Sequence, residues 1–250
     1  MLIVGNWKAY VESKAKAKAL CISAKRLASK GDNEIVIAPA APHIGFIAPA
    51  KPDAQEALKL GAQDVSITVG GAETGEVTAG PLKDLGVSYV IVGHSERRAR
   101  GESDEIVTEK ARHVLAHGMT PIICIGEIDR DTEAHYLKRV RAQLSAVMAS
   151  LSTKERLSIV IAYEPVWAIG KSELEAITPN DLSEMILYIR KVLTDFMPGR
   201  ANQKVRILYG GSVDVSNVRS LASGTGIDGF LIGRASTDVA GFTALVKAVS

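Results

Sequence analysis

Three side chains able to transfer a proton or carry charge stand at the ends of apolar runs in the sequence. Glu164 ends the run SIVIAYE, His94 ends the run 89–94, and Lys8 follows the run 2–7, two residues after Asn6. Burial at such a position would make the Glu164 carboxylate a stronger base. A carboxylate, an imidazole and an ammonium group that meet in one site can move protons and stabilise negative charge on oxygen.

Taken singly, these residues also have simpler interpretations. Most lysines lie on the surface, a single histidine in a loop is more often structural than catalytic, and an asparagine can cap a strand end. Two more acids, Glu96 and Glu127, follow other apolar runs. As members of ion pairs they would be structural rather than proton carriers, and the cations expected to pair with them are Arg97, Arg98 and Lys8.

Two glycine-containing turns follow the last two apolar runs. They read YGGS at 209–212 and IGRAS at 232–236. Small residues let backbone N–H groups approach an anion closely, and the start of a following helix adds its dipole. Glycines also serve simply to make tight turns. The coincidence of two such turns at neighbouring positions favours a phosphate-binding site.

The elements that must position these residues follow one repeating pattern. Short runs rich in Ile, Val and Leu alternate with helical stretches, and the runs are 2–7, 34–39, 60–64, 89–94, 120–126, 159–164, 205–211 and 229–233. Because the runs are apolar almost throughout, they are typical of parallel strands buried on both faces. The stretches expected to be helical are 13–29, 103–117, 133–148, 180–196 with Thr178 as cap, and the segment after Ser236.

Eight strand–helix units in 250 residues, without a linker, predict one (β/α)8 barrel domain over residues 1–250. The alternative is an open doubly wound sheet. That fold usually carries a Gly-x-Gly-x-x-Gly turn, and none occurs here. In a barrel of this kind the active site lies at the C-terminal ends of the strands, where all the residues named above would meet.

Composition narrows the classes of function. The formal net charge is +2, so no strong field is present to hold nucleic acid. The longest uncharged run, 35–50, contains three prolines and is shorter than the ~18–20 residues of a membrane-spanning helix. Two cysteines cannot form a disulfide scaffold, and a reducing cytoplasm is the simplest location.

Motifs that resemble a P-loop (GKS at 170–172) and a zinc helix (HVLAH at 113–117) are incomplete, so no metal or cofactor is expected.

Six motifs together resemble the triosephosphate isomerase family. They are GNWK at 5–8, VGHSERR at 92–98, CIGE at 124–127, AYEPVWAIG at 162–170, YGGSV at 209–213 and DGFLIG at 228–233. Each motif is weak alone, but the six occur in the family's order and span the chain. The resemblance implies a TIM barrel, usually a homodimer without cofactor, in which the loop VGGAETGEVTAG (69–80) inserts into the partner subunit.

The resemblance also implies roles for single residues. Glu164 would be the catalytic base and His94 the electrophile, while Lys8 and Asn6 would hold the substrate's carbonyl and enediolate oxygens. Glu96 matches an acid of the family's active site. The residues expected to bind substrate are Asn6, Lys8, Gly170, Ser212, Gly233 and Arg234. The activity implied is the interconversion of D-glyceraldehyde 3-phosphate and dihydroxyacetone phosphate in glycolysis and gluconeogenesis, and residues 165–170 would begin a mobile lid.

The sequence departs from the family pattern at four places. Ala9-Tyr10 replaces Met-Asn beyond the reactive residues, ARGE at 99–102 is a shortened turn, KSELEAIT at 171–178 replaces the common TGKTAT of the lid, and Arg234 replaces a glycine. The last two changes keep alternatives open. One is an isomerase acting on a four-carbon ketose phosphate such as erythrulose phosphate, and another is a barrel that binds sugar phosphates without turnover.

Overall fold

Eight parallel strands form a closed barrel in the computed structural model, which describes residues 1–48, 56–170 and 176–250. The strands follow one another around the barrel, and β1 pairs with both β2 and β8. They are β1 (Leu2–Asn6), β2 (Glu34–Ala38), β3 (Leu58–Ala62), β4 (Val87–Val92), β5 (Thr120–Ile125), β6 (Val160–Tyr163), β7 (Arg206–Tyr209) and β8 (Gly229–Ile232). The predicted (β/α)8 barrel is therefore confirmed. All eight apolar runs contain strands, although β3 and β4 begin two residues earlier than expected.

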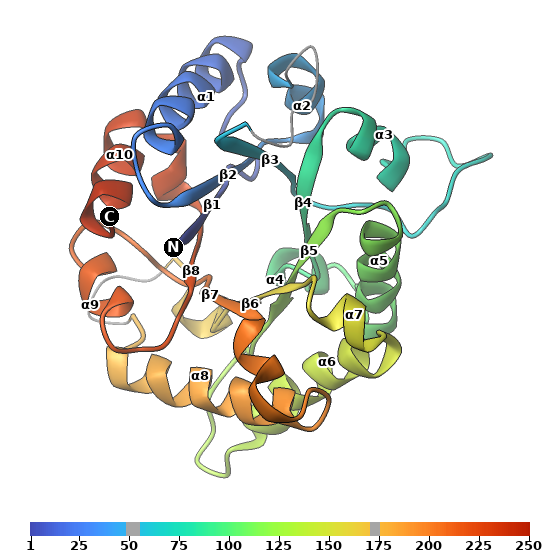
Figure 1. The fold of residues 1–250 in the computed structure, drawn as a ribbon, viewed down its shortest axis with the longest axis vertical. Coiled ribbons are helices and arrows are strands. Elements are labelled where there is room, and N and C mark those ends of the chain that lie inside the picture. The colour runs from blue at the N-terminus through green and yellow to red at the C-terminus, as the bar shows by residue number, and fades with distance from the viewer. Residues whose placement is uncertain (49–55, 171–175) are drawn as a thin grey trace.

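Helices surround the barrel in the ring that Figure 1 shows. The described helices are α1 (Lys14–Ala28), α2 (Ala41–Ile47), α3 (Ala79–Asp84), α4 (Ser95–Arg98), α5 (Asp104–Ala116), α6 (His135–Ser150), α7 (Thr153–Arg156), α8 (Pro179–Thr194), α9 (Val218–Ala222) and α10 (Val239–Ala248), with the 3-10 turns η1 (Val166–Ala168), η3 (Gly199–Lys204) and η4 (Arg234–Thr237). The predicted cap Thr178 accepts a backbone N–H of its helix, and Ser13 and Ser103 do the same for theirs. The helix predicted after Ser236 begins at Val239, capped by Asp238.

The apolar core has two parts, which correspond to the two faces of the strands. Ile3, Ile161 and Ile207 belong to the layer between the barrel and the helices. A second cluster fills the barrel interior and contains Leu2, Val4, Val36, Ala38, Tyr89, Ile91, Ile122, Cys124, Val160, Ala162, Leu208 and Leu231. Burial on both faces explains why the strands read as continuous apolar runs rather than as alternating ones.

The alternation of side chains also determines which residues meet above this interior. Along β1 the inward positions are 2 and 4, along β6 they are 160 and 162, and along β8 the inward position is 231. The next positions of the same parity are Asn6, Glu164 and Gly233. Since they lie at or just beyond the C-terminal ends of parallel strands, they meet at one mouth of the barrel.

A polar network closes the opposite end of the barrel. Glu34 accepts hydrogen bonds from the Tyr89 hydroxyl and, at 2.6 Å, from the Arg206 guanidinium, which also donates to the Tyr89 oxygen. Partial burial opposes ionisation of Glu34, but these donors outweigh it and lower the pKa of the carboxyl. Burial and the hydrogen bond to Glu34 raise the pKa of Tyr89 to about 12. Glu34 is therefore held ionised and Tyr89 neutral at physiological pH.

We expect Glu34→Gln to lower the free energy of unfolding at pH 7 by about 1 kcal/mol, because charge-assisted hydrogen bonds are replaced by neutral ones. The folded-state pKa of Glu34 lies below that of the unfolded chain, which is about 4.3. The contribution is thus present above that value and is lost as the pH falls through the folded-state pKa. Urea unfolding of both proteins between pH 7 and pH 3 measures this. A difference that grows on acidification would contradict it.

One asparagine ties the two chain ends together. The Asn33 side chain accepts from the N-terminal ammonium of Met1 at 2.8 Å and donates to the Ser250 hydroxyl at 3.0 Å. The N- and C-termini therefore lie on the same side of the barrel, next to β2.

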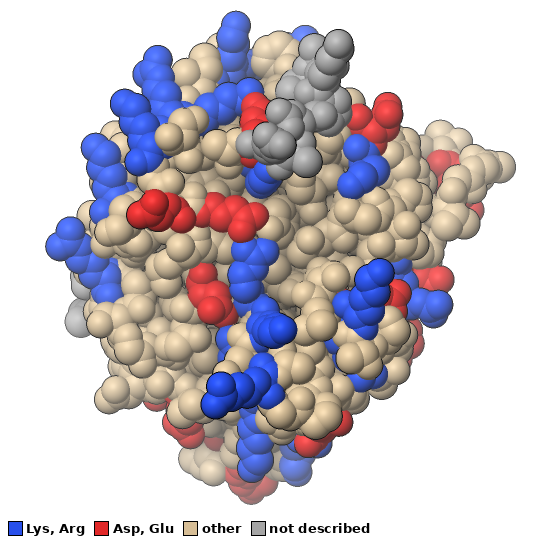
Figure 2. Space-filling view, in the orientation of Figure 1, with Lys and Arg blue, Asp and Glu red and all other residues tan. Residues whose placement is uncertain are grey.

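Both cysteines are free and buried. Burial raises the pKa of the Cys21 and Cys124 thiols, so neither thiol is activated for nucleophilic chemistry. Acidic and basic side chains are mixed over the face of the molecule that Figure 2 presents. None of the described helices is long and apolar enough to cross a membrane.

Candidate active site

A cavity of about 380 Å³ opens at the C-terminal end of the barrel. Its described lining combines the residues that follow β1, β4, β6, β7 and β8, which are far apart in the sequence. They include Asn6, Lys8, His94, Glu164, Gly170, Ser212, Gly233 and Arg234. With the exception of Glu96, the structure thus brings every predicted site residue to the wall of one cavity, and Glu96 contacts two of them.

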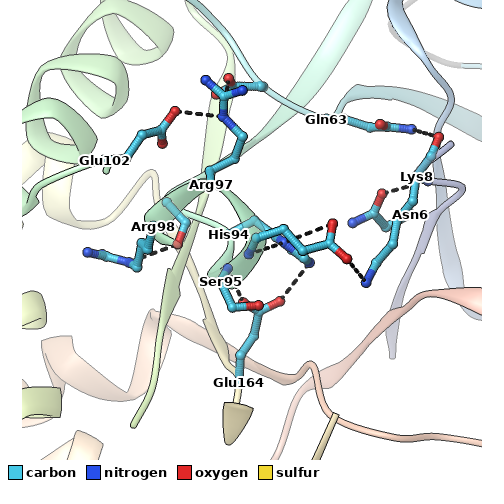
Figure 3. Close-up of polar contacts among 12 residues, drawn as sticks. Asn6, Lys8, Gln63, His94, Ser95, Arg97, Arg98, Glu102 and Glu164 are labelled. Carbon is cyan, nitrogen blue, oxygen red and sulfur yellow. Dashed lines mark hydrogen bonds and ion pairs between the residues drawn. The ribbon is translucent and has the colours of Figure 1, made fainter. Parts of the chain in front are cut away.

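Glu164 is a buried carboxylate held between two donors. Its side chain is 3% exposed, its Oε2 accepts the backbone N–H of Ser95 at 2.9 Å, and its Oε1 lies 3.2 Å from His94 Nε2. Figure 3 shows the carboxylate pointing toward both residues. Within the described residues no Lys or Arg forms an ion pair with this carboxylate, so its position is set by the Ser95 N–H and the His94 imidazole.

The His94 imidazole is fixed in one tautomer by its surroundings. His94 caps α4, and its Nδ1 accepts the backbone N–H of Glu96 at 3.2 Å. A nitrogen that accepts a hydrogen bond carries no proton, so the remaining proton of the neutral ring is on Nε2, which faces Glu164. The ring is therefore oriented as a neutral donor toward the cavity.

Lys8 reaches the cavity from a strained turn after β1. Its backbone φ is +45°, a region that side chains other than glycine enter at a cost. Two amides stabilise the turn, since Asn6 Oδ1 accepts the Lys8 N–H at 3.1 Å and Gln63 donates to the Lys8 carbonyl at 2.9 Å. The ammonium group then forms an ion pair with Glu96 at 2.8 Å.

Glu96 forms an ion pair with Lys8, one of the three cations expected to pair with it. Partial burial raises the pKa of Glu96, but the hydrogen bond and charge of Lys8 outweigh burial and bring the pKa below its ordinary value. Glu96 therefore remains ionised. Its side chain is 59% exposed, which leaves this ion pair open to competition from an incoming ligand.

Two glycines make room for Glu164. A Cβ on Gly126 would come within 1.8 Å of the Glu164 carbonyl oxygen, and a Cβ on Gly210 would come within 2.9 Å of Glu164 Cγ. Gly126 follows β5 and Gly210 follows β7, the two neighbours of β6. A side chain on Gly126 would therefore displace the Glu164 backbone, and one on Gly210 would displace the Glu164 side chain. Gly210, which the sequence suggested for anion binding, has this spatial role as well.

One part of the cavity wall is made of small residues. Gly170 has φ +71°, and Gly210, Gly211, Ser212 and Gly233 complete the wall. The Ser212 hydroxyl donates to the Ala168 carbonyl at 2.8 Å, which joins the turn after β7 to the segment after β6. A surface of this type brings backbone groups close to a bound anion.

A family model of triosephosphate isomerase matches residues 1–249 of the chain. The chain belongs to the triosephosphate isomerase family. Membership assigns to it an aldose–ketose isomerase activity of the triose-phosphate isomerase type, and it indicates a small phosphorylated sugar as substrate.

One of the ion pairs predicted from the sequence is wrong. Glu127 does not contact Arg97, Arg98 or Lys8, because its fully buried carboxylate faces outward from β5 toward the segment after β6. Its Oε1 accepts from the Tyr163 hydroxyl at 2.8 Å, the Trp167 indole at 2.9 Å and Arg130 at 3.3 Å. Glu127 is still structural, but it anchors the beginning of the predicted lid rather than α4.

Arg97 and Arg98 instead fasten α4 to its neighbours. Arg98 donates to the Gly93 carbonyl at 2.9 Å and the Cys124 carbonyl at 3.2 Å. Arg97 forms ion pairs with Asp64 and with Glu102, the last residue of the shortened turn ARGE. Figure 3 shows both arginines beside His94 and Ser95, so they hold the segment that carries the imidazole.

Sequence reasoning missed two residues of this site. Gln63 holds the Lys8 turn and also donates to the Ala38 carbonyl at 3.0 Å. Gln63 could have been found from the sequence, because it is a polar residue inside the apolar run 60–64. Tyr10 was placed beyond the reactive residues, but it lines the cavity. Most of the substituted lid segment, residues 171–175, lies outside the described residues.

Proposed function

We propose that this enzyme interconverts D-glyceraldehyde 3-phosphate and dihydroxyacetone phosphate through an enediol(ate). The observation that carries the proposal is the 3.2 Å contact between Glu164 and His94 in a cavity that also holds Lys8 and the glycine wall. The reaction moves a proton between adjacent carbons, and one carboxylate near both carbons can remove and return it. This arrangement needs neither a redox group nor a metal.

In this proposal Glu164 is the base and His94 is the electrophile. The buried carboxylate takes the proton from carbon, while the Nε2–H of the neutral imidazole donates to the substrate oxygens. Triosephosphate isomerase is the standard example of a glutamate base beside a neutral histidine, and the assignment rests on family membership as well as on geometry. The Glu164–His94 contact would then open to admit the substrate.

Lys8 and Asn6 would stabilise charge on the same oxygens. The Lys8 ammonium lies at the same cavity as His94 and Glu164, and Asn6 holds the backbone turn that presents it. Glu96 keeps the ammonium in place until substrate arrives, so its catalytic part is indirect. The phosphate group would lie against Gly170, Ser212, Gly233 and Arg234, with the segment that begins at 165–170 closing over it to exclude water.

The test is kcat/KM for D-glyceraldehyde 3-phosphate, compared with that for a four-carbon ketose phosphate such as erythrulose phosphate. A value near 10⁷–10⁸ M⁻¹s⁻¹, close to the diffusional ceiling, is expected for the triose. A higher value for the four-carbon substrate would reassign the enzyme, and Arg234 at the cavity wall is the observation that favours this alternative. Binding without turnover of either substrate would make the barrel a binding protein.

A homodimer is part of the proposal. The segment between β3 and α3 projects from the barrel in Figure 1 and exposes Val69, which is 81% accessible. A separate cavity of about 510 Å³ is lined by Ile44, Val65, Leu82 and Glu102 among others. The Oε2 atom of Glu102 is buried there without a partner among the described residues. A second copy could insert its projecting segment, and a solution mass near twice 26.6 kDa is expected.

Glycolysis and gluconeogenesis in the cytoplasm are the cellular setting that we infer. The support is indirect and comes from the family's activity and the two free, buried cysteines, which suit a reducing compartment.

A further inference from the structure

Two departures from the family pattern meet at the mouth of the cavity. Tyr10 follows β1 and Arg234 follows β8, and these strands are neighbours in the barrel. The Arg234 guanidinium carbon lies 5.6 Å from the centroid of the Tyr10 ring, within the range of a cation–π contact. Both residues line the same cavity as Lys8, His94 and Glu164. The two substituted residues therefore contact each other at the same cavity.

The charges around the cavity leave this guanidinium without a counterion. Lys8, the other cation of the described lining, is paired with Glu96. Asp214 also lines the cavity, but its Oδ1 accepts the N–H groups of Ser216 and Asn217 and the Ser216 hydroxyl. Within residues 1–48, 56–170 and 176–250, no carboxylate lies within ion-pair distance of Arg234. A ligand with negative charge would supply the missing partner.

The position of Arg234 indicates which part of the substrate its side chain can contact. It directly follows Gly233 in the wall of small residues, whereas Glu164 and His94 mark the place of the reacting carbons. A guanidinium presents N–H donors in a planar fork that matches phosphate oxygens. Because Arg234 is exposed, a free side chain would lose much rotamer entropy on binding. Stacking on Tyr10 restricts it before the ligand arrives.

We propose that Arg234 binds the substrate's phosphate group through its side chain and that Tyr10 is a positioning residue that holds the guanidinium at the cavity mouth. The inference rests on the proposed function and adds to it. It assigns to this chain a side-chain phosphate contact in addition to the backbone contacts of the glycine wall, and it gives Tyr10 a role in substrate affinity rather than in chemistry.

The first experiment measures the dissociation constant of inorganic phosphate by calorimetry at low ionic strength, where exposed charges are least screened. We expect Arg234→Gln to weaken binding about fivefold, as for loss of a partly exposed charge pair. Tyr10→Ala should weaken it about threefold and Tyr10→Phe hardly at all, because phenylalanine keeps the ring face. Arg219→Gln on α9, an exposed arginine that does not line the cavity and donates to the Ala248 carbonyl, is the matched control and should bind as the wild type does.

A double-mutant cycle separates positioning from packing. If Tyr10 acts through Arg234, Tyr10→Ala has no further effect in the Arg234→Gln background. An undiminished effect there would overturn the positioning role, and unchanged phosphate binding in Arg234→Gln would overturn the whole inference. In turnover, KM for D-glyceraldehyde 3-phosphate should rise while kcat/KM for unphosphorylated glyceraldehyde stays the same. A parallel loss for both substrates would mean that Arg234 shapes the cavity only.

The two proposals fail in different ways. A wild-type enzyme that isomerises triose phosphate, with phosphate binding insensitive to Arg234, would overturn this inference and leave the proposed function intact. An enzyme without triose turnover whose phosphate affinity still depends on Arg234 and Tyr10 would overturn the proposed function and support the phosphate contact. Phosphate calorimetry needs no turnover, so each result is obtained separately.

Discussion

Glu164→Gln is expected to lower kcat for D-glyceraldehyde 3-phosphate by about a thousandfold, within the range for loss of a general base. Glutamine keeps the shape that fits between Gly126 and Gly210, and its single amide oxygen keeps one of the two hydrogen bonds that the carboxylate accepts from Ser95 and His94. It cannot accept a proton from carbon. KM should therefore change much less than kcat, because the loss is confined to the transition state.

The matched control is the same substitution at the other end of the barrel. Glu34→Gln also replaces a hydrogen-bonded carboxylate, but it should leave kcat and KM unchanged while reducing stability. Both variants are purified identically, so any isomerase from the expression host appears equally in each. A Glu164→Gln enzyme that retains a tenth or more of the wild-type kcat would assign the proton transfer to another group.

Substitution of Lys8 should produce the second large loss of activity. Its effects on activity and on stability can be measured separately. Lys8→Gly should lower kcat/KM by about a hundred- to a thousandfold, as for removal of a charge-stabilising donor. The same variant should be more stable than Lys8→Ala by about 1 kcal/mol, because only glycine adopts φ +45° without strain. The enzyme thus holds its ammonium group on a turn that disfavours any side chain.

Comparison of the glycine and alanine variants isolates the backbone effect. Neither has the ammonium, so the ion pair with Glu96 is absent from both, and urea unfolding measures the remaining difference. Equal stability in the two variants would show that the turn is not strained. Activity close to wild type in Lys8→Gly would remove the ammonium from the mechanism.

The positions of the site residues were predictable from sequence because the fold converts spacing into geometry. Continuous apolar runs indicated parallel strands, and strands of a closed barrel end at one mouth. Glu164 at the end of one run and Gly233 at the end of another therefore had to lie at the same mouth. Their exact neighbours depended on side-chain parity, which a run of uniformly apolar residues does not reveal.

The contacts that could not be predicted are those set by packing between loops. Glu127 was expected to pair with cations of α4, but Tyr163 and Trp167 from the next unit enclose it. Tyr10 and Arg234 lie at opposite ends of the sequence, and only closure of β1 onto β8 brings them together. Local propensity contains no information about such pairs.

The Asn33 contact with both chain ends has a consequence for engineering. Since one side chain bonds the first and the last residue, the ends lie on the order of 10 Å apart, a gap that about four linking residues can span. Covalent closure there would turn the chain into a ring that can be reopened at any exposed turn. Circular permutants of this barrel could therefore begin at different strand–helix units and retain the same mouth.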